Sequence, residues 1–414
     1  MADARYRFAA NDDLTRRGLG CDARARTRGD IMPDEDGLTI YPRYMSRANG
    51  AYLWDVDNNR YVDYLLGYGP VVLGHADPRV TAAAVRELDN GSCIAPLWSP
   101  VQVELNELLV SLIPGAEASY LLKTGSDATS TAVRLARIFT GRDRVVRFGY
   151  NGWHDWAAGS PAGIPAGTRE NTLLFELTEP DSLRQLFATY PDEIACVLTM
   201  PFEYEVIPDG LLAELRDIVH RNGALFVLDE MRSGFRMRIG GAQEYFGVTA
   251  DLVTFSKAMA NGHPISAVVG RADVLDCLAR TRISSTFYAG PADMAAAMAT
   301  IAILRDTDAI EYLWHVGAAL QDGLRTLIHD GDIEAEVVGY PPAPFLRFTS
   351  DDPRRQQALT RRFFIETTRR GVLFHPDHQW FVSASHTIAD VEWTLQRCQE
   401  AFQALPAALV GRTG

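Results

Sequence analysis

The sequence predicts an α/β protein with a large doubly wound, mainly parallel sheet and a second, smaller α+β domain. Between about residues 80 and 270, short apolar stretches that suit strands alternate with longer stretches that suit helices. A helix between successive strands provides the crossover connection of a parallel sheet. After about residue 290 the pattern changes to two long helices and then to a strand-and-helix region that ends near residue 404. No Ser/Gly-rich linker separates these regions, so we expect the domains to be interleaved.

The amino-terminal part carries one clear structural signal. Residues 1–30 are rich in arginine and have no periodic apolar pattern, so we expect irregular structure there. Segment 51–63 reads as two short strands around an Asp-Asn-Asn turn, which predicts a hairpin. We therefore expect a segment 1–75 that packs with the small domain, a large domain over 76–305, and a small α+β domain over 306–414.

The remaining elements follow from apolar residues at helical spacing and from short apolar runs bounded by turns. The predicted helices cover residues 78–90, 100–112, 126–140, 181–190, 209–222, 291–305 and 308–329. The predicted strands cover residues 119–123, 144–148, 172–176, 194–200, 224–228, 252–255 and 266–269. Ligands bind at the carboxyl ends of strands in open α/β sheets, so the residues that follow these strands are the first candidates for a site.

Composition excludes several classes of function. The chain has 414 residues and a formal net charge of −13, which argues against nucleic-acid binding because that normally needs a basic face. Its five cysteines are far apart and form no Cys-x-x-Cys pair, so neither a disulfide framework nor a metal site is expected. No stretch approaches a membrane span in length. We expect a cytoplasmic protein without a membrane partner.

Lysine is rare in this chain. Lys and Arg together number 40, and only Lys123 and Lys257 are lysines. A guanidinium stays protonated and cannot form an imine with an aldehyde, so a site that needs a primary amine must keep lysine. Lys257 follows a predicted strand by two residues and is therefore a candidate Schiff-base residue. The alternative is that arginine-rich composition left two lysines by chance.

Two further features lie at carboxyl ends of predicted strands. Asp229 ends the buried run 224–228, and a carboxylate there could keep a pyridine nitrogen protonated, which makes pyridoxal phosphate an electron sink. Gly125-Ser126-Asp127 lies where a strand passes into a helix, and its backbone N–H groups with the Ser126 hydroxyl could bind an anion. The structural alternatives are that Asp229 caps a turn and that Ser126 is a plain helix N-cap.

An aromatic run follows another strand. Residues 149–156 include Tyr150 and Trp153, and either ring could stack on a flat ligand. The alternative is that these rings belong to the core or anchor a loop. These features suit a single aromatic cofactor that carries an aldehyde and a phosphate.

The chain resembles the class III pyridoxal-phosphate aminotransferases of fold-type I, and within them the glutamate-1-semialdehyde aminomutase-like branch. The resemblance spans most of the chain. It rests on residues 50–64 with 73–78, 122–128 with 132–137, 228–236, 256–264 and 285–291. The fold implied is a large pyridoxal-phosphate-binding sheet domain with a smaller α+β domain.

The resemblance implies a role for each candidate. Lys257 would hold pyridoxal 5′-phosphate as a Schiff base, and Asp229 would face the pyridine nitrogen. Gly125, Ser126 and Asp127 would belong to the phosphate-binding turn. No metal is implied.

The aromatic and partner-subunit residues are also implied by the resemblance. Both Tyr150 and Trp153 align with the stacking ring, with Trp153 preferred. Thr286 is similar to a threonine that reaches the cofactor phosphate of the partner subunit. A homodimer with active sites at the interface is therefore expected.

The expected activity is transfer of an amino group from an amino donor to a carbonyl acceptor by ping-pong chemistry, in specialised metabolism. An aminomutase, a racemase and a non-catalytic pyridoxal-phosphate-binding homologue are the alternatives. The arginine that many ω-aminotransferases use for a substrate carboxylate has no counterpart in residues 371–387, and Arg28 is out of register with the aminomutase's arginine. The donor and acceptor therefore stay open.

Overall fold

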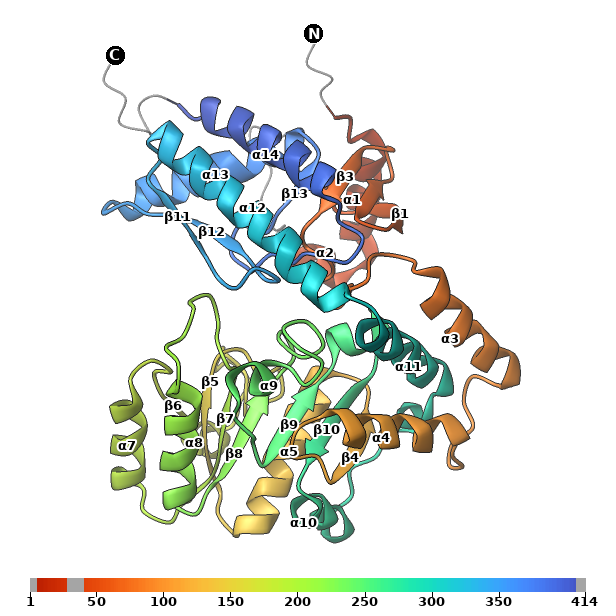
Figure 1. Ribbon diagram of the computed structural model, residues 1–414, viewed down its shortest axis with the longest axis vertical. Helices are drawn as coiled ribbons and strands as arrows, with labels where there is room; N and C mark the ends of the chain where they lie inside the picture. The colour runs from red at the N-terminus through yellow and green to blue at the C-terminus, as the bar shows by residue number, and fades with distance from the viewer. Residues whose placement is uncertain (1–5, 28–40, 407–414) are drawn as a thin grey trace. The chain divides into compact units, whose positions relative to one another are not determined.

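The computed structural model describes residues 6–27 and 41–406, which form two compact units (Figure 1). One unit is Met1–Asp77 with Glu311–Gly414, and the other is Pro78–Ile310. Arg28 lies outside the described residues. Within the described ranges, no helix is long and apolar enough to cross a membrane.

The unit Pro78–Ile310 is built on a seven-stranded sheet with the order β4-β10-β9-β8-β7-β5-β6. Five neighbouring strands, β9 to β6 in this order, run parallel, whereas β10 is antiparallel to both β9 and β4. The strands are β4 (Ala118–Leu122), β5 (Arg144–Phe148), β6 (Thr172–Leu174), β7 (Ile194–Thr199), β8 (Leu225–Asp229), β9 (Leu252–Phe255) and β10 (Ser266–Gly270). This mainly parallel sheet confirms the predicted fold class.

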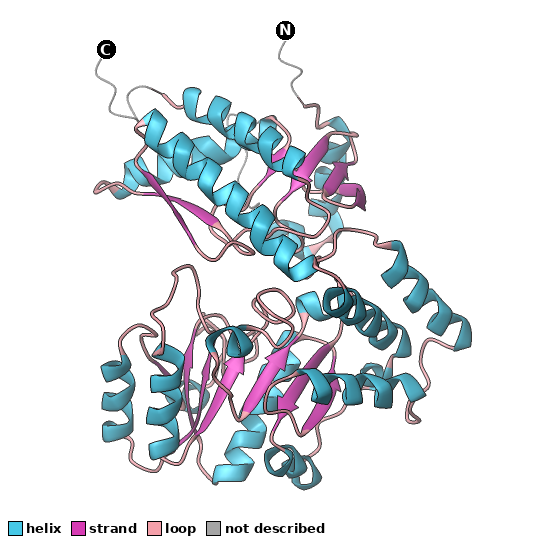
Figure 2. Ribbon diagram, in the orientation of Figure 1, coloured by secondary structure: helices cyan, strands magenta, loops and turns pink. Residues whose placement is uncertain are grey.

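Helices surround this sheet (Figure 2). The α-helices of the unit are α3 (Pro78–Asn90), α4 (Pro100–Leu112), α5 (Gly125–Thr140), α6 (Ala166–Glu170), α7 (Pro180–Thr189), α8 (Leu211–Arg221), α9 (Ala242–Phe246), α10 (Ala272–Leu275) and α11 (Pro291–Asp306). Short 3₁₀ helices are η1 (Lys257–Ala260), η2 (Asp276–Arg280) and η3 (Thr286–Ala289). The short helices were not predicted because four or five residues do not establish a helical period.

Helix α5 begins and ends where its sequence dictates. Thr124 is the N-cap, and it forms a capping box with Asp127, in which each side chain accepts from the backbone of the other residue. Gly141 ends the helix in the left-handed conformation with φ of +71°. The buried face includes Ala132 and Leu135 and packs on the sheet. The start of α5 is thereby fixed directly after β4.

The other unit contains a four-stranded sheet and a two-stranded sheet. The first has the order β1 (Met45–Asn49), β2 (Tyr52–Asp55), β3 (Arg60–Asp63) and β13 (Val372–Leu373), and the second pairs β11 (Ala335–Val338) with β12 (Phe345–Phe348). Its long helices are α12 (Ala309–Gly331), whose first two residues belong to the other unit, α13 (Pro353–Arg369) and α14 (Ile388–Gln403). Strands β2 and β3 are antiparallel, which confirms the predicted hairpin.

The expectation of irregular structure near the amino terminus was wrong. Residues Ala9–Cys21 form α1 and Ala23–Thr27 form α2. The N–H groups of Ala10 and Asn11 donate to the Asp57 carboxylate at 2.8 and 2.9 Å. The side-chain oxygen of the buried Asn11 accepts from the N–H groups of Arg43 and Tyr44. Polar contacts with the hairpin therefore hold α1, and an apolar period in the sequence could not reveal it.

Candidate active site

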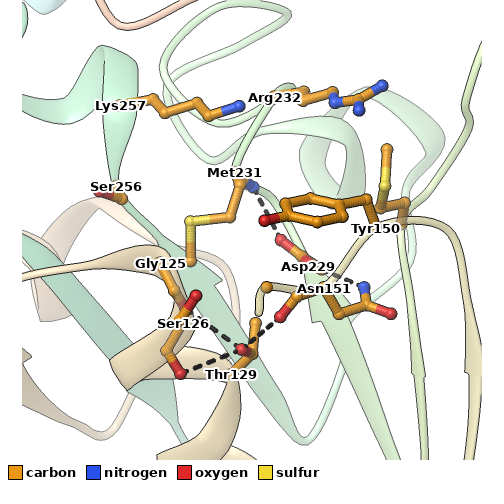
Figure 3. A pocket seen from close by; sticks show the side chains of 12 residues that line it. Gly125, Ser126, Thr129, Tyr150, Asn151, Asp229, Met231, Arg232, Ser256 and Lys257 are labelled. Atoms are coloured by element: carbon orange, nitrogen blue, oxygen red, sulfur yellow. Dashed lines mark hydrogen bonds between the residues drawn. The ribbon is translucent and has the colours of Figure 1, made fainter. Parts of the chain in front are cut away.

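A pocket of about 170 Å³ lies where strands β8 and β9 end and helix α5 begins (Figure 3). It is lined by Gly125, Ser126, Thr129, Tyr150, Asn151, Gly152, Met200, Asp229, Met231, Arg232, Ser256 and Lys257. In the view of Figure 3, Lys257 and Arg232 lie above Tyr150 and Asp229, and Ser126 and Thr129 lie below them. The pocket therefore brings a lysine, a carboxylate and a helix start together.

Lys257 enters the pocket from a strained turn. It follows β9 by two residues and has φ of +46°, a left-handed conformation that costs a residue other than glycine about 1–3 kcal/mol. The Ser256 hydroxyl donates to the Ile265 carbonyl at 2.7 Å and helps to hold this turn. Burial, and then the positive charge of Arg232, lower the pKa of Lys257 to about 7, although the Asp229 carboxylate opposes them. A large fraction of this amine is therefore neutral at neutral pH.

Asp229 is the last residue of β8 and only 1% exposed. Its Oδ2 accepts from Nδ2 of Asn151 at 2.8 Å, and its Oδ1 accepts from the Met231 N–H at 3.2 Å. Burial raises the pKa of Asp229 in spite of these hydrogen bonds and the nearby positive charges. A further cationic hydrogen-bond donor would stabilise the ionised form of this buried carboxylate.

Glu230, the second acid of the sequence motif, does not line the pocket. It is 1% exposed, and its carboxylate accepts from the Ser233 hydroxyl and from the N–H groups of Ala242 and Gln243. Burial raises its pKa to about 7. Glu230 therefore anchors the start of α9, and the two neighbouring acids have separate tasks.

The start of α5 forms a cradle with the loop after β5. The Trp153 N–H donates to the Ser126 hydroxyl at 3.3 Å, and the Thr129 hydroxyl donates to the Asn151 carbonyl at 2.7 Å. Gly152 has φ of +116°, and a Cβ atom there would lie 2.5 Å from Oγ of Ser126. The first N–H groups of a helix have no partner within the helix and carry partial positive charge. This cradle suits an anion.

Three predicted site residues lie outside the lining of this pocket. The Asp127 carboxylate accepts from the N–H and hydroxyl of Thr124 within the capping box. Trp153 is 71% exposed and its ring lies beside His154, whereas Tyr150 is part of the lining. Thr286 is exposed at the first position of η3. The preference for Trp153 over Tyr150 is therefore not supported by the position of the two rings.

Sequence reasoning missed several lining residues. Thr129 is three residues after Ser126 on α5, so helical spacing could have placed it on the same face. Met231 follows Asp229 by two residues and could have been included with it, and Arg232, expected from the sequence to occupy a solvated loop position, also lines the pocket. Asn151 carries no such signal, because its contact with Asp229 joins residues 78 positions apart.

The sequence model of the family described as "Aminotransferase class-III" matches residues 34–405. The chain belongs to this family. The aminotransferase is 32% identical to "3-aminobutyryl-CoA aminotransferase" of Cloacimonas acidaminovorans, with 87% of this chain and 89% of the relative covered. It is 34% identical to "Aminopentol aminotransferase" of Sphingopyxis macrogoltabida, with 91% and 89% covered. It is also 34% identical to "Glutamate-1-semialdehyde 2,1-aminomutase" of Methanothermobacter thermautotrophicus, with 88% and 93% covered.

A solved structure with the same fold contains the cofactor. The "PLP internal aldimine form" of FumI from Sphingopyxis sp. MTA144 superposes with a TM-score of 0.88 at 32% identity and covers 95% of this chain and 96% of its own. A glutamate-1-semialdehyde aminomutase from Pseudomonas aeruginosa PAO1 shares the fold at 22% identity, with a TM-score of 0.83 and 95% and 94% covered. These findings confirm the predicted family, the fold-type I architecture, the aminotransferase activity and the cofactor, pyridoxal 5′-phosphate.

The pocket of the aminotransferase fits this cofactor. Asp229 offers a buried carboxylate to a pyridine nitrogen, and the cradle of Gly125 and Ser126 offers N–H groups and a hydroxyl to a phosphate. In addition, Oδ1 of Asn151 is buried and has no hydrogen-bond partner among the described residues. Lys257 carries a primary amine, the group that an imine with an aldehyde requires.

Proposed function

We propose that this aminotransferase exchanges an amino group between an amino donor and a carbonyl acceptor by ping-pong chemistry, with Lys257 and Asp229 as its catalytic residues. The observation that carries the proposal is the register of two neighbouring parallel strands. Asp229 pairs with Thr254, and Lys257 follows Thr254 by three residues. Both side chains thus reach one pocket from the carboxyl ends of β8 and β9.

Lys257 would act as carrier of the cofactor and as the proton-transfer group. When bound, pyridoxal phosphate supplies an aldehyde for the amine and a protonated ring that withdraws electrons from the reacting carbon. The neutral Nζ of Lys257 can accept a proton from the substrate carbon, and the resulting ammonium can return it to a neighbouring atom. A pKa near neutrality suits both directions of this transfer.

The other lining residues would bind and orient the cofactor. Asp229 would accept a hydrogen bond from the pyridine nitrogen and keep its proton in place, while Asn151 holds the carboxylate in position. Gly125 and Ser126 would bind the phosphate at the start of α5. Tyr150, rather than Trp153, would supply the aromatic face, because Tyr150 lines the pocket.

Replacing Tyr150 by alanine is expected to weaken pyridoxal-phosphate binding about tenfold, which corresponds to about 1.4 kcal/mol of lost stacking and burial. Trp153→Ala should change the Kd by less than about twofold, because that ring lies outside the pocket lining. Tyr150→Phe keeps the ring and is the matched control. Fluorescence titration of cofactor-free protein measures all three values. The reverse order of the two alanine variants would assign the stacking role to Trp153.

Arg232→Gln is expected to raise the pKa of Lys257 above about 7, because the variant loses a positive charge that disfavours the lysine ammonium. Only the neutral amine attacks an aldehyde, so pyridoxal-phosphate uptake by the cofactor-free protein is slow below this pKa and fast above it. The midpoint of the uptake rate against pH should therefore move to higher pH. Arg221→Gln, at an exposed position on α8, is the control and should keep the midpoint near 7. An unchanged or lower midpoint in Arg232→Gln would contradict the electrostatic role.

The enzyme would function as a homodimer in which Thr286 contacts the partner's cofactor. Support comes from large apolar side chains that are exposed next to Thr286 and in the segment that contains Cys93. Leu97 is 73%, Trp98 is 75% and Phe287 is 66% exposed, and Sγ of Cys93 lies 4.0 Å from the Thr286 carbonyl. Such surface suits burial against a second copy. Sedimentation of the cofactor-loaded enzyme should show a dimer. A stable, active monomer would refute the proposed homodimer.

The names of two relatives support an amino donor that is not an α-amino acid. One relative is named for 3-aminobutyryl-CoA and the other for aminopentol. A third is named as a 2,1-aminomutase, which favours an internal amine shift as the second candidate function.

A single-substrate experiment separates the two functions. The cofactor-loaded enzyme is mixed with an excess of one amine and with no carbonyl acceptor. A transaminase releases one equivalent of carbonyl product per site and stops until an acceptor is added. Many turnovers of an isomerised product, with no effect of an acceptor, would instead establish the mutase reaction.

A further inference from the structure

Lys123, the second of the two lysines, is held by a carboxylate in the same unit as the pocket. Its Nζ forms an ion pair with Oδ2 of Asp293, and the two side chains are 15% and 20% exposed. Nδ1 of His263 lies 3.5 Å from Oδ1 of the same carboxylate. Although burial alone would raise it, the hydrogen bonds from His263 and Lys123 hold the pKa of Asp293 below its usual value. One carboxylate thus joins two basic side chains.

These three residues come from three segments that the proposed function assigns to the cofactor. Lys123 directly precedes Thr124, the N-cap of α5, and so leads into the phosphate cradle. His263 follows η1, the turn that begins with Lys257, and its N–H donates to the Ala260 carbonyl.

Asp293 belongs to the first turn of α11 and therefore follows η3, which begins with Thr286. Helix α11 also packs against η1. A single carboxylate consequently ties the segments of Ser126, Lys257 and Thr286 together.

The site explains a lysine at residue 123 in a chain whose basic residues, apart from Lys257, are all arginines. A Cβ atom on Gly290, which lies between η3 and α11, would be 3.0 Å from Nζ of Lys123. The backbone therefore approaches the ammonium closely. A guanidinium is planar and larger than an ammonium, so an arginine at residue 123 would have to displace the Gly290 backbone or leave Asp293.

We propose that Lys123, Asp293 and His263 form a positioning cluster that fixes the phosphate cradle relative to Lys257 and Thr286 and thereby sets the affinity for pyridoxal phosphate. None of the three lines the pocket, so they act through the segments they join. The inference rests on the proposed roles of those segments.

The test compares Asp293→Asn and Lys123→Met with a control ion pair. Asp293→Asn keeps the size of the side chain and removes its charge, and Lys123→Met keeps the length and removes the ammonium. The control is Glu193→Gln, which breaks the 2.8 Å pair with Arg144 at the amino end of β5, away from the carboxyl ends that form the pocket. Each variant is measured for its Kd for pyridoxal phosphate and for its Tm with and without the cofactor.

Both cluster variants should raise the Kd about ten- to hundredfold. Mutating a residue that does not touch a bound metal but orients its ligands lowers metal affinity by this factor, and we expect the same for residues that orient the cofactor-binding segments. The gain in Tm on adding the cofactor should shrink, while the cofactor-free Tm stays close to wild type. Glu193→Gln should keep the wild-type Kd and the wild-type increase in Tm on adding the cofactor. Lys123→Arg should also weaken binding, because the larger head group would have to displace the Gly290 backbone or leave Asp293.

Several results would contradict the proposed positioning role of the cluster. A Kd within about twofold of wild type in Asp293→Asn would do so, as would equal losses of Tm with and without the cofactor, since these indicate a purely structural pair. Failure of both cluster variants to fold would also assign the pair to folding instead of positioning. A wild-type protein that binds no pyridoxal phosphate would instead defeat the proposed function, so the two failures are distinguishable.

Discussion

Replacement of Lys257 by alanine is expected to abolish amino-group exchange, with a fall in kcat of at least about 10⁴-fold. General acid–base catalysis alone contributes about 10²–10⁴-fold, and the variant also loses the amine that carries the cofactor. No other lysine can replace it, because Lys123 is the only other lysine and is paired with Asp293. The measurement is a two-substrate rate at saturating cofactor, donor and acceptor.

Lys257→Arg is the matched variant, because it keeps a long basic side chain but cannot form an imine with an aldehyde. It should be as inactive as the alanine variant. Circular dichroism and gel filtration of both variants should match the wild type, since the left-handed turn at residue 257 is costly for any side chain other than glycine. Exchange at even one hundredth of the wild-type rate in either variant would show that another group carries out the chemistry.

Asp229→Asn is expected to lower kcat about 10²–10³-fold, the cost of removing one electrostatic group from a buried catalytic site. The amide keeps the shape of the side chain but has no charge with which to hold a proton on the pyridine nitrogen. Because burial raises the pKa of Asp229, its ionised form is disfavoured in the cofactor-free fold. The cofactor-free variant should therefore be at least as stable as wild type toward denaturant.

Glu230→Gln is the neighbouring control and should show the opposite result. Although burial also raises the pKa of Glu230, both of its carboxylate oxygens accept hydrogen bonds, from the Ser233 hydroxyl and from the N–H groups of Ala242 and Gln243. A glutamine has only one accepting oxygen and would leave a backbone N–H without an acceptor, so the variant should lose about 1–3 kcal/mol of unfolding free energy. Its rate with bound cofactor should stay within about threefold of wild type. If Asp229→Asn instead lost stability and kept its rate, Asp229 would be a structural residue.

The chemistry at strand ends made part of the site predictable from sequence. Asp229 ends one short buried strand and Lys257 follows another by two residues, and the structure places these strands as parallel neighbours. The start of α5 was predicted to within one residue, but its N-cap is Thr124, in a capping box with Asp127, and not Ser126. Local pattern and strand order are enough for these residues.

The remaining features of the site and the fold depend on contacts between residues far apart in the sequence, so they could not be predicted from it. Which ring enters the pocket depends on the backbone path through residues 149–152, where both glycines have positive φ, and no period describes such a loop. The Asn151 contact with Asp229 and the contacts of α1 with Asp57 join distant residues through polar groups. The Lys123 pair with Asp293 likewise spans 170 positions. Hydrophobic patterning carries no information on such pairs.

The central claim is that Lys257 carries the cofactor, and chemical reduction tests it most directly. Borohydride converts the bond between pyridoxal phosphate and a lysine into a stable secondary amine, and peptide mass spectrometry then locates the modified residue. The chain has only two lysines, so the assignment is binary. We predict modification of the peptide that contains Lys257 and an unmodified Lys123 peptide. Modification of Lys123, or of neither lysine in a cofactor-loaded enzyme, would contradict the account.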